Sequence, residues 1–266
     1  MYAFNYHKAA SVADAQTKLA SSTDGKILAG GQTLIAAMRL RLAAPTDLID
    51  LGGIAELRGI RVDGSNLVIG AMTTHATVAA SPEVKRTIPA LAHLAEWIGD
   101  RMVRNVGTIG GSVANNDPAA DYPAAVLALD ATIVTQSRRI TAGDFFLGMY
   151  QTALEPGELV TAISFPIPKR AGYVKFPNPA SRYPIAGVFV SEGASGMRVA
   201  VTGAGPGVFR VPAMEKGLSA GFAPDALNGI AVDATTLSGD MHASAEYRAH
   251  LVTVIAKRAV QQALGR

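Results

Sequence analysis

The 266-residue chain has no cysteine, little charge and no long apolar run, and each absence excludes a class of function. Without cysteine it forms no disulfide, carries no thiolate nucleophile and supplies no cysteine ligand to an iron–sulfur cluster. Charged residues make up 17%, the formal net charge is +3 and no run of five like charges occurs, which disfavours nucleic acid as a partner. No apolar run reaches the roughly 18 residues that span a bilayer, and the N-terminus has no signal-peptide pattern. We expect a cytoplasmic protein without a membrane span.

Several catalytic signatures are also missing. The five histidines form no H-x-x-x-H or H-E-x-x-H pair, so we expect no metal site. The stretch Gly110–Ala114 departs from the G-x-S-x-G nucleophile elbow at its last position, and no G-x-x-x-x-G-K-[ST] phosphate loop occurs. We therefore predict no catalytic residue of a hydrolase or of a nucleotide triphosphatase on this chain.

Hydrophobic residues account for 49% of the chain, which excludes intrinsic disorder and supplies a large core. The first 55 residues alternate between helix and strand with short connections. A capping-box pattern at Ser11–Asp14 opens a helix, and a buried strand is predicted at Lys26–Ala29. A helix over Thr33–Leu42 and a strand over Asp47–Leu51 complete this α/β unit.

The pattern changes after this unit. A hairpin is predicted around Asp63–Asn66, and helices are predicted over Thr74–Ala80, Pro89–Gly99 and Ala124–Leu129. The segment Val106–Pro118 contains too much glycine for a regular helix or strand. Strands are expected over 131–135, 159–165, 173–176, 185–191 and 197–202, and a final helix over 244–264. Prolines crowd the region near residue 170, which we interpret as a subdomain boundary.

Three glycine clusters are candidates for ligand binding. In Ala29–Thr33, between a predicted strand and a predicted helix, bare backbone suits a phosphate, although a plain tight turn is the alternative. In Gly107–Ser112 two hydroxyls bracket bare backbone, which again suits an anion. The third, Val199–Gly207, imitates a nicotinamide dinucleotide fingerprint, but its prolines prevent the required helix. We interpret the third cluster as a strand that ends in a loop.

Two single residues have alternative interpretations. Asp121 has the chemistry to accept hydrogen bonds from sugar hydroxyls, or it is an exposed N-cap of the helix that follows. Trp97 lies on the apolar helix face of Leu91 and Leu94, and we interpret it as a core residue.

Taken together, these motifs resemble the FAD-binding subunit of molybdenum hydroxylases. The resemblance rests on A-G-G-Q-T at Ala29–Thr33, on R-N-x-G-T-I-G-G-S at Arg104–Ser112 and on D-P-A-A-D-Y-P-A at Asp117–Ala124. It continues through Glu158–Pro166, through Tyr173–Phe176 with Arg182, and along the C-terminal helix. The family comprises the medium chains of carbon monoxide dehydrogenase-like enzymes and is related to the flavin domain of xanthine dehydrogenase.

The resemblance implies an α+β fold of the vanillyl-alcohol-oxidase (PCMH) type. It implies two FAD-binding subdomains at residues 1–55 and 56–170 and a smaller C-terminal subdomain at 171–266. The pyrophosphate of FAD would lie against Ile27, Leu28, Ala29, Gly30, Gly31, Gln32, Thr33 and Leu34 and against Thr108, Ile109, Gly110, Gly111 and Ser112. Asp121 would bind the adenosine ribose, Ile98 and Val160 would line the cofactor, and Lys175 would lie near the flavin and raise its potential.

The function implied is that of an electron-transfer subunit with FAD as its cofactor. A large molybdopterin-binding subunit would oxidise the substrate, and a small [2Fe-2S] subunit would pass electrons to this chain, in a heterotrimer or its dimer. The chain alone would oxidise no substrate. The alternatives are a non-catalytic binding or assembly protein of the same fold and, less favoured, a self-contained FAD oxidase. If amides of the second cluster hold the pyrophosphate, Gly110→Val should lose FAD and stay folded, whereas Gly205→Val should keep FAD.

Overall fold

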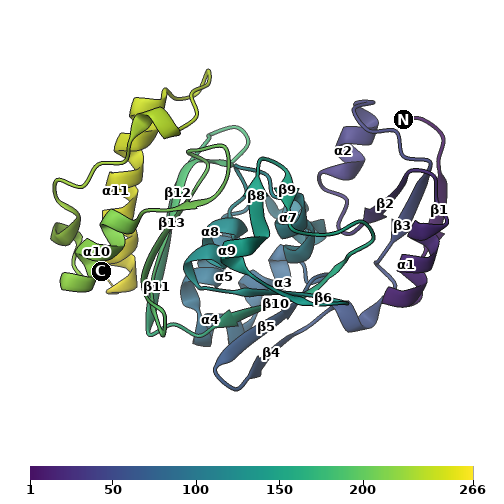
Figure 1. The fold of residues 1–266 in the computed structure, drawn as a ribbon, viewed down its shortest axis with the longest axis horizontal. Coiled ribbons are helices and arrows are strands. Elements are labelled where there is room, and N and C mark those ends of the chain that lie inside the picture. The colour runs from purple at the N-terminus through teal and green to yellow at the C-terminus, as the bar shows by residue number, and fades with distance from the viewer. Residues whose placement is uncertain (266) are drawn as a thin grey trace.

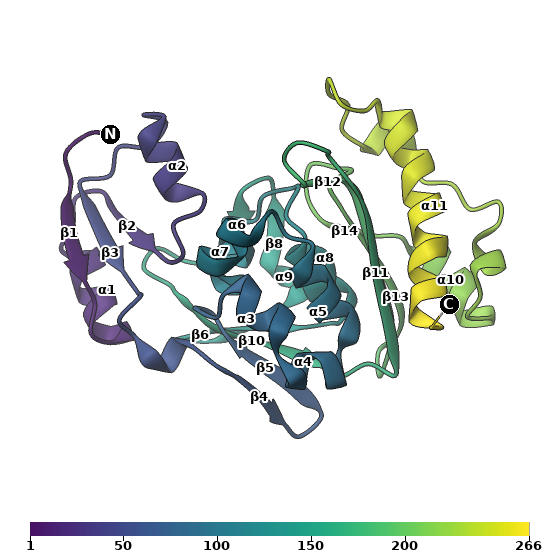
Figure 2. The same ribbon diagram turned by 180° about the vertical axis from the view of Figure 1, so that it is seen from behind.

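The structure is a computed structural model that describes residues 1–265. The three larger of the four β-sheets in the described residues follow one another along the chain and lie in a row, with the first and last parts at opposite ends of the molecule (Figure 1). Figure 2 shows the same order from behind. We call them the N-terminal, middle and C-terminal sheets. The predicted subdomains 1–55, 56–170 and 171–266 correspond to one sheet each, and their boundaries stay a prediction.

The N-terminal sheet is small and parallel, with the strand order β1-β3-β2. Ser11 starts its first helix as predicted, because its side chain accepts a hydrogen bond from the backbone N–H of Asp14 at 3.1 Å. The elements are β1 (Asn5–Lys8), α1 (Val12–Ala20), β2 (Gly25–Leu28), α2 (Leu34–Arg39), β3 (Asp47–Asp50) and the 3₁₀ turn η1 (Ala55–Leu57). The glycine cluster at Ala29–Thr33 connects β2 to α2.

The middle sheet is antiparallel, with the order β4-β5-β10-β6-β7. Its centre is apolar, since Ile163 of β10 lies opposite Ile69 of β5 and Ile133 of β6. The strands are β4 (Ile60–Asp63), β5 (Asn66–Gly70), β6 (Thr132–Thr135), β7 (Arg139–Thr141) and β10 (Val160–Pro166), with a separate hairpin of β8 (Phe146–Gly148) and β9 (Gln151–Thr152). The helices are α3 (His75–Ala80), α4 (Pro82–Thr87), α5 (Pro89–Glu96), α6 (Arg101–Val106), α7 (Ile109–Asn115), α8 (Tyr122–Ala128) and α9 (Ala142–Phe145).

The C-terminal sheet is an antiparallel meander covered on one face by the last helix (Figure 1). Helix α11 approaches β11 so closely that a β-carbon at Gly172 would lie 2.1 Å from the carbonyl oxygen of Ala259. The elements are β11 (Arg170–Pro177), β12 (Pro184–Gly193), β13 (Gly196–Thr202), β14 (Phe209–Arg210), α10 (Pro212–Ala220), η2 (Pro224–Leu227), η3 (Ala234–Thr236) and α11 (Ala245–Ala263). Within residues 1–265 we find no helix with the length and apolarity to cross a membrane.

The largest core continues from the middle sheet into the C-terminal sheet. Tyr173, Phe189 and Ala200 of the C-terminal sheet are fully buried together with the helices and strands of the middle part. Likewise Met72 and Leu159 of the middle part complete the core beneath the N-terminal sheet. The three parts are therefore joined by shared apolar packing and not only by the chain.

Two predictions from the sequence are wrong. The glycine-rich segment after Val106 is not irregular: it contains α7, whose N-cap Thr108 accepts a hydrogen bond from the N–H of Gly111 at 3.2 Å. Trp97 is not a core residue, because α5 ends at Glu96 and the indole that follows is 47% exposed. The apolar face of α5 is completed by Leu91 and Leu94 without it.

Candidate functional site: a cavity between the glycine clusters

A cavity of about 630 Å³ lies between the N-terminal part and the middle part. This volume is within the range of small-molecule sites in proteins. All but three of the residues predicted to bind the cofactor line it, namely Ile27, Ala29, Gly30, Gly31, Gln32, Thr33, Leu34, Ile98, Thr108, Gly110, Gly111, Ser112, Asp121 and Val160. Leu28, Ile109 and Lys175 do not line it, and the fully buried Ile109 belongs to the core.

The first glycine cluster offers a row of free backbone donors. Within the described chain, the N–H groups of Gly30, Gly31, Gln32 and Thr33 have no hydrogen-bond partner. Gly31 has φ +75°, a conformation that favours glycine, and Thr33 occupies the N-cap of α2 without a side-chain capping bond. Free N–H groups and a free hydroxyl that line one cavity fit the oxygens of a phosphate.

The second glycine cluster plays a different part from the one predicted. The N–H of Ile109 donates to Thr73 O at 3.1 Å, that of Gly110 to Ala71 O at 2.9 Å and that of Gly111 to Thr108 Oγ1. These amides are therefore not available to a pyrophosphate. At Gly110 a β-carbon would lie 2.4 Å from the β-carbon of Ala71, so this glycine makes room for protein and not for ligand.

The two clusters meet in space although about 80 positions separate them. A β-carbon at Gly30 would lie 2.1 Å from Val106 O, and one at Gly111 would lie 3.4 Å from the β-carbon of Ala29. Glycine at these positions lets the backbone of the N-terminal part touch the backbone of the middle part. Thr108 and Ser112 then line the same cavity as the free amides of the first cluster.

Asp121 and Lys175 form a buried pair next to the cavity. Lys175 Nζ lies 2.9 Å from Asp121 Oδ1 and 2.9 Å from Trp97 O, and the Tyr173 hydroxyl donates to Asp121 Oδ1 at 2.6 Å. Burial raises the pKa of Asp121, and the Lys175 ammonium and the Tyr173 hydroxyl oppose that shift. Burial and the Asp121 charge also raise the pKa of Tyr173.

This pair corrects one interpretation of Asp121. Asp121 occupies the N-cap of α8, but it is buried and makes no capping bond, so the exposed N-cap alternative is wrong. Lys175 uses its ammonium within the protein and does not line the cavity. The roles expected for Asp121 at the adenosine ribose and for Lys175 near the flavin stay predictions.

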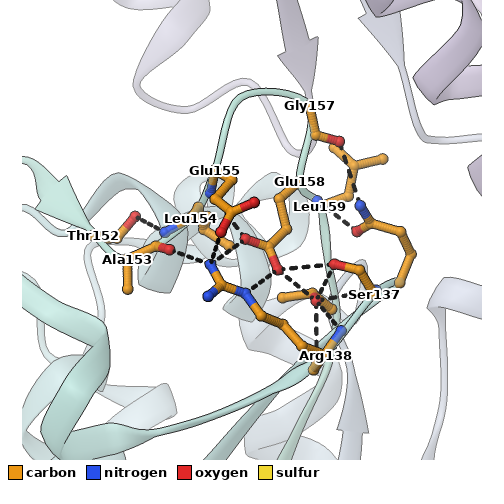
Figure 3. A network of polar contacts seen from close by, with 11 residues as sticks. Ser137, Arg138, Thr152, Ala153, Leu154, Glu155, Gly157, Glu158 and Leu159 are labelled. Atoms are coloured by element: carbon orange, nitrogen blue, oxygen red, sulfur yellow. Dashed lines mark hydrogen bonds and ion pairs between the residues drawn. The ribbon is translucent and has the colours of Figure 1, made fainter.

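A polar network fixes the cavity wall on the side of Val160. Glu158 is almost fully buried, and both of its oxygens accept hydrogen bonds from Arg138, at 2.9 and 2.8 Å (Figure 3). Ser137 and Thr135 donate to the same carboxylate. The hydrogen bonds, led by that of Arg138, lower the pKa of Glu158 to about 2. The network ties the β6–β7 turn to the loop before β10, and hence to Val160.

Sequence reasoning missed His75, which lines the cavity from the start of α3. Its ring lies 5.3 Å from that of Tyr122, and its buried Nδ1 has no partner within residues 1–265. Burial first, and then the charge of Arg104, lowers the pKa of His75 to about 4, so the ring is neutral at pH 7. A single histidine in an apolar helix start carries no signal for a cavity. Arg182, which belongs to the family resemblance, and Tyr183 also line the cavity.

The third glycine cluster takes no part in the cavity. Strand β13 ends at Thr202, Gly203 turns with φ +78°, and the short strand β14 follows at Phe209–Arg210. The interpretation of this cluster as a strand ending in a loop is confirmed, and no helix follows its glycines as a dinucleotide fingerprint requires.

A cavity between two parts of an α+β protein, lined by free amides at a glycine turn, has the features of a nucleotide-cofactor site. A family model described as "FAD binding domain in molybdopterin dehydrogenase" matches residues 2–168. The chain is 36% identical over 275 residues to the nicotine 6-hydroxylase medium subunit of Paenarthrobacter nicotinovorans, covering 98% of this chain and 97% of that subunit. It is 36% identical over 280 residues to the carbon monoxide dehydrogenase medium chain of Hydrogenophaga pseudoflava, covering 99% and 98%.

Solved structures agree with these sequence relatives. Carbon monoxide dehydrogenase from Hydrogenophaga pseudoflava superposes with a TM-score of 0.89 at 34% identity, covering 99% of this chain and 98% of that chain. Quinoline 2-oxidoreductase from Pseudomonas putida 86 superposes with a TM-score of 0.86 at 28% identity, with the same coverages. The chain belongs to the FAD-binding medium subunits of the molybdenum hydroxylase family. The predicted α+β fold of FAD-binding type and the predicted cofactor FAD are confirmed.

Proposed function

We propose that this chain transfers electrons within a molybdenum hydroxylase. Its FAD accepts electrons from [2Fe-2S] clusters of a partner subunit and passes them to a terminal acceptor. Bound flavin would supply a redox group that exchanges electrons either in pairs or one at a time. The observation that carries the proposal is the row of free N–H groups at Gly30–Thr33 in a cavity large enough for a dinucleotide. The other residues of the cavity would bind FAD and orient it.

The structure supports a revised set of roles for the cavity residues. The free amides from Gly30 to Thr33 would hold the pyrophosphate, and Thr108 and Ser112, which line the same cavity, would lie beside it. The isoalloxazine ring would lie toward Ile98, where Lys175 holds the adjoining carbonyl of Trp97. Asp121 pairs with that lysine and holds it in place. We retain the division into two FAD-binding subdomains, 1–55 and 56–170, and a C-terminal subdomain, 171–266.

The partners follow from what this chain lacks and from its relatives. The two sequence relatives described above are a medium subunit and a medium chain by name. The solved carbon monoxide dehydrogenase from Hydrogenophaga pseudoflava is described as lacking the Mo-pyranopterin moiety of its molybdenum cofactor. Because this chain has no cysteine, cluster ligands must come from another chain. We therefore propose a large molybdopterin-binding subunit and a small [2Fe-2S] subunit, in a heterotrimer or its dimer. The cytoplasmic location expected from the sequence stays a prediction.

Surface chemistry supports a docking partner on the side of the cavity. The chain exposes Leu40 and Leu42 just after α2, and it exposes Met102 and Val106 on α6. In Figure 2, α2 belongs to the N-terminal part and α6 to the side of the middle part that is nearer to it. Clusters of exposed large apolar side chains are common where a second protein docks.

The test begins with the complex that co-purifies with this chain. We expect one FAD per chain after acid extraction and fluorescence assay. We also expect that the complex oxidises an aldehyde, a purine or carbon monoxide with an artificial electron acceptor, and that the isolated chain does not. Turnover by the isolated chain would overturn the electron-transfer role. Absence of flavin, seen as no absorption near ~450 nm in the isolated chain and no extractable FAD in the complex, would favour a binding or assembly protein.

A further inference from the structure

The cavity wall contains a short turn whose backbone carbonyls are held by cations. Residues Trp97 to Gly99 link α5 to α6, and both Ile98 and Gly99 line the cavity. Gly99 has φ +48°, and a β-carbon there would lie 2.9 Å from the side chain of Val103. The turn thus has a conformation that suits glycine and excludes a larger residue at this position.

Three cationic side chains from three elements donate to the carbonyls of this turn. Lys175 of β11 donates to Trp97 O at 2.9 Å. Arg104 of α6 donates through one guanidinium nitrogen to Ile98 O and to Gly99 O, both at 2.9 Å. Arg182, in the loop before β12, donates to Gly99 O at 3.3 Å. Three successive carbonyls therefore all accept from positively charged groups, which is more than the end of a helix requires.

The charges of the three donors are balanced differently. Lys175 is paired with Asp121. In contrast, neither Arg104 nor Arg182 has an acidic partner within 4.0 Å among residues 1–265. The charge of Arg104 also contributes to the lowered pKa of His75, another residue of the cavity wall. Arg104 is only half-buried, but its hydrogen bonds keep its charge directly behind the wall at Ile98.

We propose that Arg104 is a positioning residue for the flavin ring of FAD. It fixes the carbonyls of Ile98 and Gly99, so that the cavity wall presents Ile98 to the ring, and it keeps an unpaired positive charge behind that wall. The inference rests on the proposed function, since it requires the isoalloxazine ring at this end of the cavity. A cation at this place favours the flavin after it has gained electrons, because the reduced ring carries more negative charge.

The experiment compares three variants in the co-purified complex. Arg104→Gln loses the charge and one of the two hydrogen bonds or both. Arg104→Lys keeps the charge on a shorter group. Arg101→Gln is the matched control, because Arg101 belongs to the same helix, is exposed and makes no hydrogen bond or ion pair within the described residues. For each variant we would measure the dissociation constant of FAD, the visible circular dichroism of the flavin, its midpoint potential and the melting temperature.

We expect Arg104→Gln to bind FAD about tenfold more weakly, because the carbonyls of Ile98 and Gly99 are no longer fixed and the wall is less well preorganised for the ring. Its flavin should have a more negative midpoint potential, and Arg104→Lys should restore most of that shift while Arg101→Gln behaves as wild type. Wild-type affinity and potential in Arg104→Gln would overturn the inference, and so would weaker binding with an unchanged potential. If the wild-type complex holds no FAD, the proposed function fails instead.

Discussion

Gly110→Ala distinguishes a glycine that makes room for the protein from one that makes room for a ligand. The added β-carbon would lie 2.4 Å from the β-carbon of Ala71 and 2.8 Å from its Cα and carbonyl oxygen. Gly110 is fully buried at the start of α7, so either α7 or the end of β5 must move. Overpacking of this kind costs up to about 3 kcal/mol, while exchanging glycine for alanine within a helix returns up to about 1 kcal/mol.

The expected result is a net loss of about 2 kcal/mol of folding free energy. For a protein of this size such a loss lowers the melting temperature by about 4–8 °C. The measurement is thermal unfolding by circular dichroism on protein from which FAD has been removed, so that ligand binding does not contribute. Gly207→Ala is the matched control, since a β-carbon at Gly207 meets nothing within 4 Å.

One result would refute this reasoning. If FAD-free Gly110→Ala melts at the wild-type temperature and yet fails to bind FAD, Gly110 faces the cofactor. The earlier expectation that Gly110→Val yields a folded protein without FAD would then be correct. A destabilised protein that still binds FAD when folded would instead confirm that this glycine serves the contact between α7 and β5.

Three further predictions concern the other parts of the site. Thr33→Val should weaken FAD binding about tenfold in isothermal titration calorimetry, because it removes a free hydroxyl next to the pyrophosphate. Thr23→Val is the control and should bind FAD as the wild type does, since Thr23 is exposed and outside the cavity. Equal affinities of the two variants would contradict the assignment. Lys175→Met should lower the free energy of unfolding, measured in urea, by about 3–5 kcal/mol, because it leaves the buried Asp121 carboxylate without its cationic partner. A loss below about 1 kcal/mol would show that this ion pair does not stabilise the fold. The lowered pKa of Glu158 contributes folding stability that is complete above about pH 4.5 and is lost as the pH falls toward about 2. In Glu158→Gln the free energy of unfolding should therefore change less with pH over this range than in the wild type. Parallel pH profiles of the two proteins would argue against this role of Glu158.

Local sequence patterns predicted most of the strands, the capped helix after Ser11 and the long C-terminal helix. These elements have clear apolar periodicity or a capping residue, and both signals are local. The first strand, Asn5–Lys8, was missed because it has no apolar alternation. It is a strand because it pairs in parallel with β3, where His7 Nε2 lies 2.8 Å from Asp47 Oδ1. Such a pairing over about 40 positions leaves no trace in a short window.

The site was predictable to the extent that it depends on backbone. Glycine at positions 30 and 31 indicates a close approach between backbone segments and an unusual φ. Gly30 lies against the backbone of Val106, and Gly31 has φ +75°. The helix α7 was missed because the low helix propensity of Gly110 and Gly111 was given more weight than tertiary packing. The contact of Asp121 with a lysine 54 positions later could not be inferred from spacing. Only the fold brings the two charges together.

The packing of Tyr173, Phe189 and Ala200 into the middle core sets the order in which the protein can fold during synthesis. When residue 168 leaves the ribosome, all of the segment matched by the family model has been made. At that moment Asp121 still lacks both Lys175 and the Tyr173 hydroxyl, and the core still lacks its last three side chains. A nascent chain of that length therefore holds an Asp121 carboxylate without its two partners and an open apolar face. The cavity can reach its final shape only after the C-terminal sheet has been translated.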